Sequence, residues 1–208
     1  MNLKMAGLSV GLMLALGAHA LETIKLPAVE KTGGKPLMAA LQARRSNRAI
    51  ADKEVSLETL AGLLWAANGY NRPDMRTNAT GMNKQEITIW VCRADGAYRY
   101  DAKEHALVPV YEGDLRPAVA GRQSFVKTAP LALVITADVS DPVYGGGGST
   151  MSHYDAGIVS GNIYLYCASQ GLATVCRGTM DQAAIKKALK LGDKTLLHLN
   201  HPVGWPQE

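Results

Sequence analysis

The densest group of chemically capable side chains lies in residues 44–48, which read Arg-Arg-Ser-Asn-Arg. Guanidinium groups bind phosphate oxygens through paired N–H donors, and a serine hydroxyl adds a short hydrogen bond. The same residues also suit the solvated end of a helix, where cations interact favourably with the helix dipole. The segment therefore allows two interpretations, an anion-binding site or an ordinary basic helix end.

A second polar group occupies residues 76–85, which read Arg-Thr-Asn-Ala-Thr-Gly-Met-Asn-Lys-Gln. These residues fall in a long polar loop that the sequence predicts over residues 70–86, and loops of such length are often functional. Amide, hydroxyl and cationic donors gathered in one loop suit the polar edge of a planar heterocycle. Many surface loops have the same composition, so this loop becomes a candidate only together with other segments.

Three other groups of residues give weaker evidence of a chemical function. His198 and His201 lie three positions apart, a spacing that faces opposite sides of a strand, so we expect no shared metal ion. Ser160 lacks the flanking glycines of a nucleophile elbow, and its small neighbours indicate close helix packing. The tyrosines around it are expected to be core or interface aromatics, namely Tyr154, Tyr164 and Tyr166.

The chain has three cysteines, Cys92, Cys167 and Cys176. An odd, low number argues against a scaffold built on disulfides. Cys92 lies in an apolar run and is expected to be a small buried hydrophobe. Whether Cys167 and Cys176 pair with each other stays open.

The elements that must position these groups follow from apolar periodicity and capping residues. Helices are predicted over residues 36–46, from the N-cap Ser56 to Asn68, over residues 152–170 before Gly171, and from a capping box at Thr179–Gln182 to Leu191. Strands are predicted over residues 87–93, 97–100, 131–137, 173–176 and 195–199, the first two joined by an Asp95-Gly96 turn. The irregular alternation of helices and strands predicts a mixed sheet covered by helices.

The chain has 208 residues, with 22 lysines and arginines against 18 acidic residues and 47% hydrophobic residues. This size and apolar content predict a single globular domain and exclude a disordered chain. The formal charge of +4 is small and the basic residues are scattered, so there is no electrostatic case for a nucleic-acid partner.

Residues 1–20 have the pattern of a secretory signal peptide. Lys4 precedes an uncharged run, and Ala18-His19-Ala20 matches an A-x-A cleavage site. The run is shorter than the about 20 residues of a membrane span, so no stable span is expected after its removal. We therefore predict a lead-in over residues 21–35 and a domain over residues 36–208, exported to the periplasm. The alternative is an uncleaved N-terminal helix, which leaves the protein in the cytoplasm.

Taken in order, five segments of the chain resemble the FMN-dependent nitroreductase superfamily. They are RRSNR, RTNATGMNKQ, APLALVITA, DAGIVSGNIYLYCASQGLAT and the closing VGWP, and they span about Leu37 to Pro206. The resemblance implies a nitroreductase-like α+β or α/β three-layer sandwich, with a mixed, mainly antiparallel sheet flanked by helices. It also implies a flavoprotein that binds FMN at the subunit interface of a homodimer.

The resemblance assigns roles to the first cluster. Arg44, Ser46 and Arg48 match the family's Arg-x-Ser-x-Arg/Lys motif, which holds the FMN phosphate and approaches the pyrimidine edge of the flavin. Arg45 lies inside the motif and is included among the cofactor-binding residues. Cations at these places stabilise the negative charge that the reduced flavin develops near N1 and C2=O.

Further roles fall in the other two segments. Asn83 and Gln85 match an Asn-x-Gln pair, of which the asparagine contacts the isoalloxazine ring. Arg177 and Gly178 fall where the family presents a backbone N–H to flavin N5. Because the flavin carries the redox chemistry, the resemblance implies no catalytic side chain and no metal.

The implied function is two-electron transfer from NAD(P)H or another donor, through FMN, to a small-molecule acceptor such as a nitro compound or a quinone. The chain departs from the family at Ala79-Thr80, where Pro-Ser is usual, and it lacks basic residues after Pro206 that commonly join the phosphate site. These departures leave a rival interpretation, a non-catalytic exported binding protein with a degenerate flavin site.

Overall fold

The computed structural model describes residues 21–141 and 148–208, and side chains in the second range from residue 150 onward. The predicted signal peptide, residues 1–20, lies outside the described residues. Within those residues no helix is long and apolar enough to cross a membrane.

A seven-stranded sheet in the order β1-β6-β5-β4-β7-β9-β8 forms the middle of the molecule. Its strands are β1 (Ile24–Lys25), β4 (Ile87–Cys92), β5 (Gly96–Asp101), β6 (Ala106–Glu112), β7 (Leu131–Asp138), β8 (Ala173–Thr174) and β9 (Thr195–Gly204). Each of the pairings is antiparallel. The central strand β7 is buried from residue 131 to 137, which confirms the predicted strand with two covered faces.

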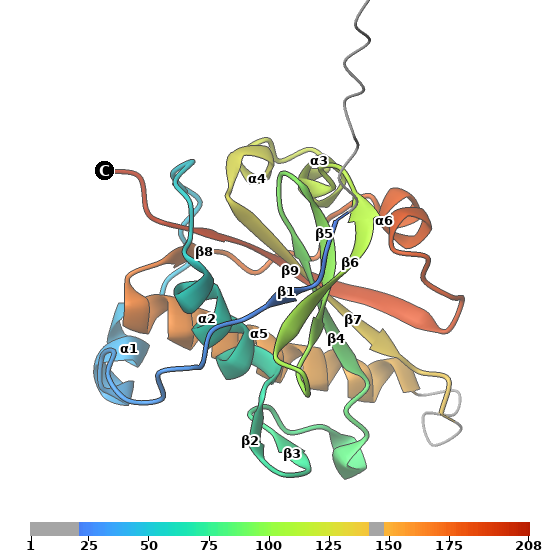
Figure 1. Ribbon diagram of the computed structural model, residues 1–208, viewed down its shortest axis with the longest axis horizontal. Coiled ribbons are helices and arrows are strands. Elements are labelled where there is room, and N and C mark those ends of the chain that lie inside the picture. The colour runs from blue at the N-terminus through green and yellow to red at the C-terminus, as the bar shows by residue number, and fades with distance from the viewer. Residues whose placement is uncertain (1–20, 142–147) are drawn as a thin grey trace, which may run out of the picture.

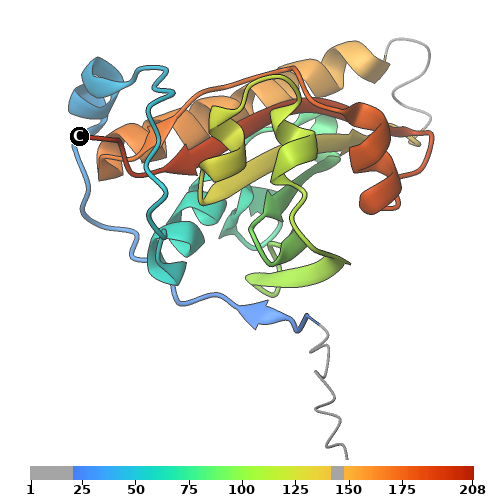
Figure 2. The ribbon, with the colours of Figure 1, turned by 90° about the horizontal axis from the view of Figure 1, so that it is seen from above.

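Helices cover both faces of the sheet (Figures 1 and 2). On one face lie α1 (Leu37–Ala43), α2 (Leu57–Asn68) and α5 (Gly148–Gln170), and on the other α3 (Arg116–Ala120), α4 (Phe125–Thr128) and α6 (Gln182–Ala188). Leu133 and Ile135 of β7 enter the core under α2 and α5, whereas Ala132 and Val134 enter the core under α3, α4 and α6. Alternate side chains of one strand therefore serve two cores, and the predicted three-layer sandwich is confirmed.

Two helix ends behave as their residues predict. Ser56 caps α2 by accepting the Thr59 N–H, and α5 stops at Gly171, whose φ of +77° is the left-handed conformation that glycine adopts easily. The cap of α6 is a correction: Asp181, not Thr179, accepts the helix N–H, from Ala184. Asp181 is the cap because it directly precedes the first helical residue, which places its carboxylate within reach of the amide three positions later.

The stretch predicted as a loop over residues 70–86 contains regular structure instead. It forms a hairpin of β2 (Tyr70–Arg72) and β3 (Met75–Arg76), followed by the 3-10 turn η1 (Gly81–Asn83). The hairpin turns at Pro73-Asp74, a pair whose fixed φ and side-chain acceptor favour a tight turn. In Figure 1 the hairpin lies at the bottom of the molecule, and α1 lies at its left.

Strand β9 carries a bulge that changes which way its histidines face. Its register against β7 shifts between Ile135 and Thr136, and Leu197 and Leu199 enter different cores although they are two positions apart. Consequently His198 and His201 both face α5, where they bond to the hydroxyls of Ser152 (3.0 Å) and Ser160 (2.8 Å). The expectation that they face opposite sides is wrong, because the bulge adds one residue between them.

Candidate functional site

The arginine-rich segment 44–48 begins where α1 ends. Arg44 leaves the helix with φ −58° and ψ 123°, and the Asn47 N–H then bonds to the Thr174 carbonyl at 2.8 Å. The segment thus runs in extended form beside β8, a conformation in which alternate side chains point to opposite sides. This alternation assigns Arg44, Ser46 and Arg48 to one side and Arg45 and Asn47 to the other, and the contacts of Arg44 and Ser46 with Tyr164 and of Arg45 and Asn47 with a separate pocket agree with it.

Tyr164 of α5 lies against the first of these sides. Its hydroxyl is 2.7 Å from the Ser46 Oγ, and the Arg44 guanidinium carbon lies 5.2 Å from the centre of its ring. The same hydroxyl accepts the Cys176 N–H at 2.8 Å. One side chain therefore contacts both the arginine-rich segment and the segment that follows β8.

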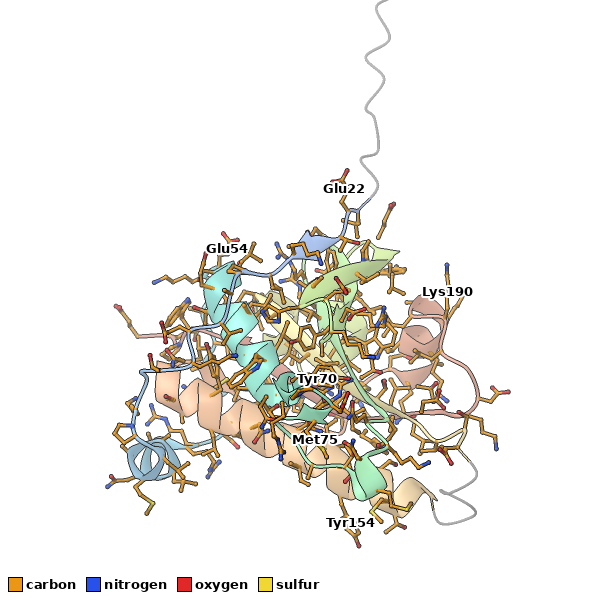
Figure 3. The ribbon with its side chains drawn as sticks, turned by 60° about the horizontal axis from the view of Figure 1, so that its bottom comes forward. Glu22, Glu54, Tyr70, Met75, Tyr154 and Lys190 are labelled. Atoms are coloured by element: carbon orange, nitrogen blue, oxygen red, sulfur yellow. The ribbon has the colours of Figure 1, made fainter. Side chains whose placement is uncertain are left out.

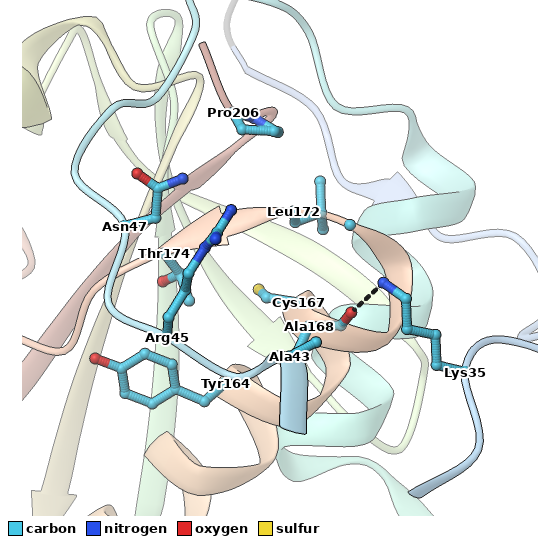
Figure 4. Close-up of a pocket in the computed structure, with 11 residues that line it drawn as sticks. Lys35, Ala43, Arg45, Asn47, Tyr164, Cys167, Ala168, Leu172, Thr174 and Pro206 are labelled. Carbon is cyan, nitrogen blue, oxygen red and sulfur yellow. Dashed lines mark hydrogen bonds between the residues drawn. The ribbon is translucent and has the colours of Figure 1, made fainter. Parts of the chain in front are cut away.

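Arg45 belongs to a separate place. With Asn47 and Lys35 it lines a pocket of about 210 Å³ between the end of α5, β8 and the chain's last residues, and Arg44, Ser46 and Arg48 do not line that pocket. Figure 4 shows Arg45 pointing into it, with Tyr164 at one wall. The structure thus separates Arg45 from the three residues with which the sequence grouped it.

The arginines of this segment lack carboxylate neighbours. The salt bridges among the described residues use Lys25, Lys84, Arg93, Arg99 and Arg116, so none neutralises residues 44–48. Arg48 also lies close enough to Arg177 to lower the pKa of that guanidinium, although burial of Arg177 lowers it more. Gathered positive charge without acidic partners favours an anionic ligand.

Arg177 itself is a structural residue. Its buried guanidinium donates to the Val119 and Ala120 carbonyls of α3 and to the Asn200 side chain. Its backbone N–H donates to the Asn200 carbonyl at 2.9 Å. The exposed Gly178 follows, and in the part of the chain that the structure describes no hydrogen bond uses its N–H. Of the two amides that the sequence nominated, only that of Gly178 is available to a ligand.

Asn83 and Gln85 lie in a loop whose polar groups satisfy one another. The Gln85 Oε1 accepts from the Tyr70 hydroxyl (2.9 Å) and the Arg76 Nε (3.1 Å). Its Nε2 donates to the Asp74 carbonyl (2.8 Å) and the Asn83 Oδ1 (2.9 Å). Gln85 therefore fixes this loop to the β2–β3 hairpin with every hydrogen-bonding position it has.

The loop also holds an unusual backbone conformation. Met82, Asn83 and Gln85 have φ values of +51°, +54° and +55°, a region that costs non-glycine residues energy and that clusters at functional sites. The Gly81 N–H is anchored to the Asp155 carboxylate of α5 at 3.1 Å. Such a rigid loop presents the exposed Asn83 at a fixed place.

The two groups lie on opposite flanks of α5. Asp155 contacts the loop and Tyr164 contacts the arginine-rich segment, and nine positions at 100° each place these residues half a turn apart and about 13 Å along the axis. We call residues 44–48, Tyr164 and residues 176–178 the Tyr164 flank, and residues 70–85 the Gln85 loop. One copy of the chain does not bring them together on one side of the helix.

Between the two flanks α5 presents an apolar surface to solvent. Tyr154 and Ile158 are 65% and 41% exposed, and Figure 3 shows Tyr154 pointing away from the body of the protein. Gly157 and Gly161 have open space where a side chain would be, so another backbone can approach closely. Other exposed apolar residues lie on η1 and α1, namely Met82, Leu37, Met38 and Leu41. Exposed apolar surface of this kind is typical of a protein interface.

Comparison with known proteins agrees with this architecture. Residues 41–205 match the model of the nitroreductase family. The chain is a member of the nitroreductase family. It is 30% identical to a candidate nitroreductase of Methanocaldococcus jannaschii, over 87% of this chain and 95% of that protein.

Solved structures show the same nitroreductase fold. A candidate nitroreductase from Ralstonia eutropha superposes with a TM-score of 0.83 at 34% identity, covering 90% of this chain and 91% of that one. A nitroreductase family protein from Clostridium novyi shares the fold at 16% identity, with a TM-score of 0.62 and coverage of 84% and 87%. The chain is therefore an oxidoreductase of a family whose members typically use a flavin, act on small molecules and form dimers.

The described residues also bear on possible metal and thiol sites. Among the described residues no group of three or more His, Cys, Asp or Glu side chains is placed to hold a metal ion. Cys167 and Cys176 are both free thiols in this structure, and burial raises the pKa of Cys92 to about 12. Tyr164 was classed from sequence only as a core or interface aromatic, and no sequence signal marks its contact with Ser46.

Proposed function

We propose that this member of the nitroreductase family is an FMN-dependent oxidoreductase that passes two electrons from NAD(P)H or another donor to a nitro, quinone or similar small-molecule acceptor. The observation that carries the proposal is the Tyr164 flank, where Arg44, Ser46 and Arg48 share one side of an extended segment without acidic partners. Guanidinium and hydroxyl donors are the groups that a phosphate monoester such as FMN requires.

The residues present fit the cofactor, and each has a task. Arg44 and Ser46 hold the phosphate, and Arg48 faces the negative edge of the ring. The free Gly178 N–H supplies a donor for the reducible part of the flavin, and the missing side chain lets the backbone approach closely. When bound, FMN supplies the redox chemistry, and the chain supplies position and charge.

We further propose that the site is completed by a second copy of the chain. The Tyr164 flank and the Gln85 loop lie on opposite sides of α5, and the apolar surface between them includes Tyr154 and Ile158. Pairing two copies through this surface by a two-fold axis places the Gln85 loop of one copy beside the Tyr164 flank of the other. In such a homodimer Asn83 reaches the flavin held by the partner.

We also propose that the protein is exported, on the strength of residues 1–20 alone. Nicotinamide cofactors are scarce outside the cytoplasm, so for an exported enzyme another reductant is the expected donor.

The visible absorption spectrum tests the proposed cofactor. Purified protein with excess FMN, freed of unbound flavin, should keep flavin bands that bleach with dithionite, and with NADH if that is the donor. R44A should lose the bands, whereas R99A, which removes a half-buried arginine paired with Asp101, should keep them. Wild-type protein that retains no flavin would contradict the proposal and favour a non-catalytic binding protein.

A further inference from the structure

Tyr164 touches two segments that the proposed flavin site needs in a fixed relation. Its hydroxyl lies 2.7 Å from the Ser46 Oγ and accepts the Cys176 N–H at 2.8 Å. Ser46 belongs to the segment proposed to hold the phosphate, and Cys176 is two residues before the free Gly178 amide. No other described side chain bonds to both segments through one atom.

The ring of Tyr164 is fixed from two sides. The Arg44 guanidinium lies over it at 5.2 Å, and the buried His201 meets it edge-on at 5.2 Å with an interplanar angle of 81°. His201 is itself held, because the Thr174 hydroxyl donates to the Pro202 carbonyl and so accepts from Nδ1, which leaves Nε2 to accept from Ser160. A ring clamped in this way keeps its hydroxyl in one place.

We propose that Tyr164 is a positioning residue that joins the phosphate-binding and ring-binding parts of the flavin site, and that its hydroxyl directs the Ser46 proton toward the FMN phosphate. A phenol has one hydrogen. The Cys176 N–H occupies one acceptor position of the Tyr164 oxygen, and in the proposed arrangement the phenol hydrogen goes to the Ser46 Oγ, so that the Ser46 hydrogen is left to bond to an external acceptor. The inference rests on the proposed FMN function.

These hydrogen bonds all run in one direction, and the phosphate is the last acceptor in the series. A backbone N–H donates to a phenol, the phenol to a serine, and the serine to an anion, and each bond polarises the next. Riboflavin has the same ring and ribityl chain as FMN but no phosphate. The Tyr164 hydroxyl should therefore favour FMN over riboflavin, which a merely structural tyrosine would not do.

The test compares Y164F with Y166F. Tyr166 is on the same helix, but its hydroxyl donates to the Thr59 carbonyl of α2, away from the site. Titrations of each full-length variant with FMN and with riboflavin, followed by flavin fluorescence, give the discrimination ratio. Y164F should bind FMN about tenfold more weakly, the loss of one hydrogen bond to a charged network, and riboflavin with a smaller loss, because the ring-binding part loses only the support of the Cys176 N–H. Y166F should match the wild type for both ligands.

A double-mutant cycle with S46A sharpens the result. If Tyr164 acts through Ser46, S46A should lose a similar factor and the double variant little more, whereas independent roles would multiply the losses. Ser46 is exposed, so S46A spares the core and keeps the test valid if Y164F does not fold. A wild-type discrimination ratio in either folded single variant would overturn the inference. Wild-type protein that binds no FMN would instead contradict the proposed function.

Discussion

The polar groups on the two flanks of α5 differ in how many partners they have within the chain. In the Gln85 loop, Gln85 makes four hydrogen bonds to its own neighbours, and the loop is anchored on Asp155. In the Tyr164 flank, the arginines stay without acidic partners and the Gly178 amide without an acceptor among the described residues. One region is complete in the free chain, and the other is complete only with a ligand.

This difference indicates how the site divides its work. Gathering Arg44 and Arg48 without counter-charges costs the folded chain some repulsion, which an anion relieves on binding. The Gln85 loop pays no such cost and keeps its strained backbone in place through its own hydrogen bonds. We infer that the Tyr164 flank supplies affinity and that the Gln85 loop supplies shape.

The largest effect is expected from separating the flanks of two copies. I158R places a charge in the exposed apolar surface of α5 and should convert a dimer into monomers that bind almost no FMN, because a buried unpaired charge is strongly unfavourable at an interface. Sedimentation and flavin titration measure both effects. The control is Y111R, which changes an exposed tyrosine on β6. A monomeric I158R that binds FMN like the wild type would show that one copy holds the whole site.

Within the Tyr164 flank, R44A should weaken FMN binding about a hundredfold, the typical cost of a charged hydrogen-bond donor to phosphate. The free energy of unfolding without FMN should change by no more than about 1 kcal/mol, because Arg44 is exposed and loses only its contact with the Tyr164 ring. Fluorescence titration and urea unfolding provide the two numbers. A variant that unfolds more easily but binds normally would assign Arg44 to structure.

The Gln85 loop should respond in the reverse way. Q85A leaves the Arg76 Nε, the Tyr70 hydroxyl and the Asn83 Oδ1 without their partner, and should lower the free energy of unfolding by about 2 kcal/mol. FMN binding should weaken by about tenfold, since Asn83 loses its support. Urea unfolding without flavin measures the first effect. A stability equal to that of the wild type would remove the contrast between the two regions.

The smallest effect per residue concerns acid. Burial lowers the pKa of His201 to about 3, and burial together with His153 lowers that of His198 to about 4. The unfolded chain takes up these protons below about pH 6.5 and the folded chain does not, so stability is complete above pH 6.5 and falls as pH drops below it. The loss per histidine is at most about 1.4 kcal/mol per pH unit. Urea unfolding at pH 7.5 and 5.5 measures it, and equal stabilities would contradict it.

Low pH should also affect the two regions differently, because residues 70–85 contain no histidine whereas His201 supports Tyr164. Hydrogen exchange corrected for intrinsic rates should show lower protection around His201 at pH 5.5, with residues 76–85 unchanged.

Sequence patterns predicted the layers of the fold and most of the site's segments. The Ser56 cap, the apolar run of β7 and Gly171 were sufficient to predict the start of α2, strand β7 and the end of α5, because each of these signals acts locally. The short helices α3 and α4 and strand β6, with Pro109 in its middle, went unpredicted because tertiary contacts rather than periodicity hold them. The bulge in β9 also has no local signal. The hairpin at Pro73-Asp74 did have one, since that pair favours a turn.

Of the candidate site, the sequence predicted the residues of the arginine-rich motif but not the contacts that surround them. Arg44, Ser46 and Arg48 do share one side of an extended segment, but only packing shows that Arg45 points elsewhere and that the Arg177 amide is taken by Asn200. Tyr164 lies 118 positions from Ser46, so no spacing rule connects them.

Mixing two damaged variants tests the central claim, that each flavin site joins the Tyr164 flank of one copy to the Gln85 loop of the other. R44A and Q85A are mixed under conditions that exchange subunits, at an FMN concentration where neither variant alone retains flavin. Random exchange makes half of the dimers mixed, each with one intact site, so about a quarter of the wild-type flavin should be recovered. Verified mixed dimers that retain no flavin would show that both regions act within one chain, and would contradict the account.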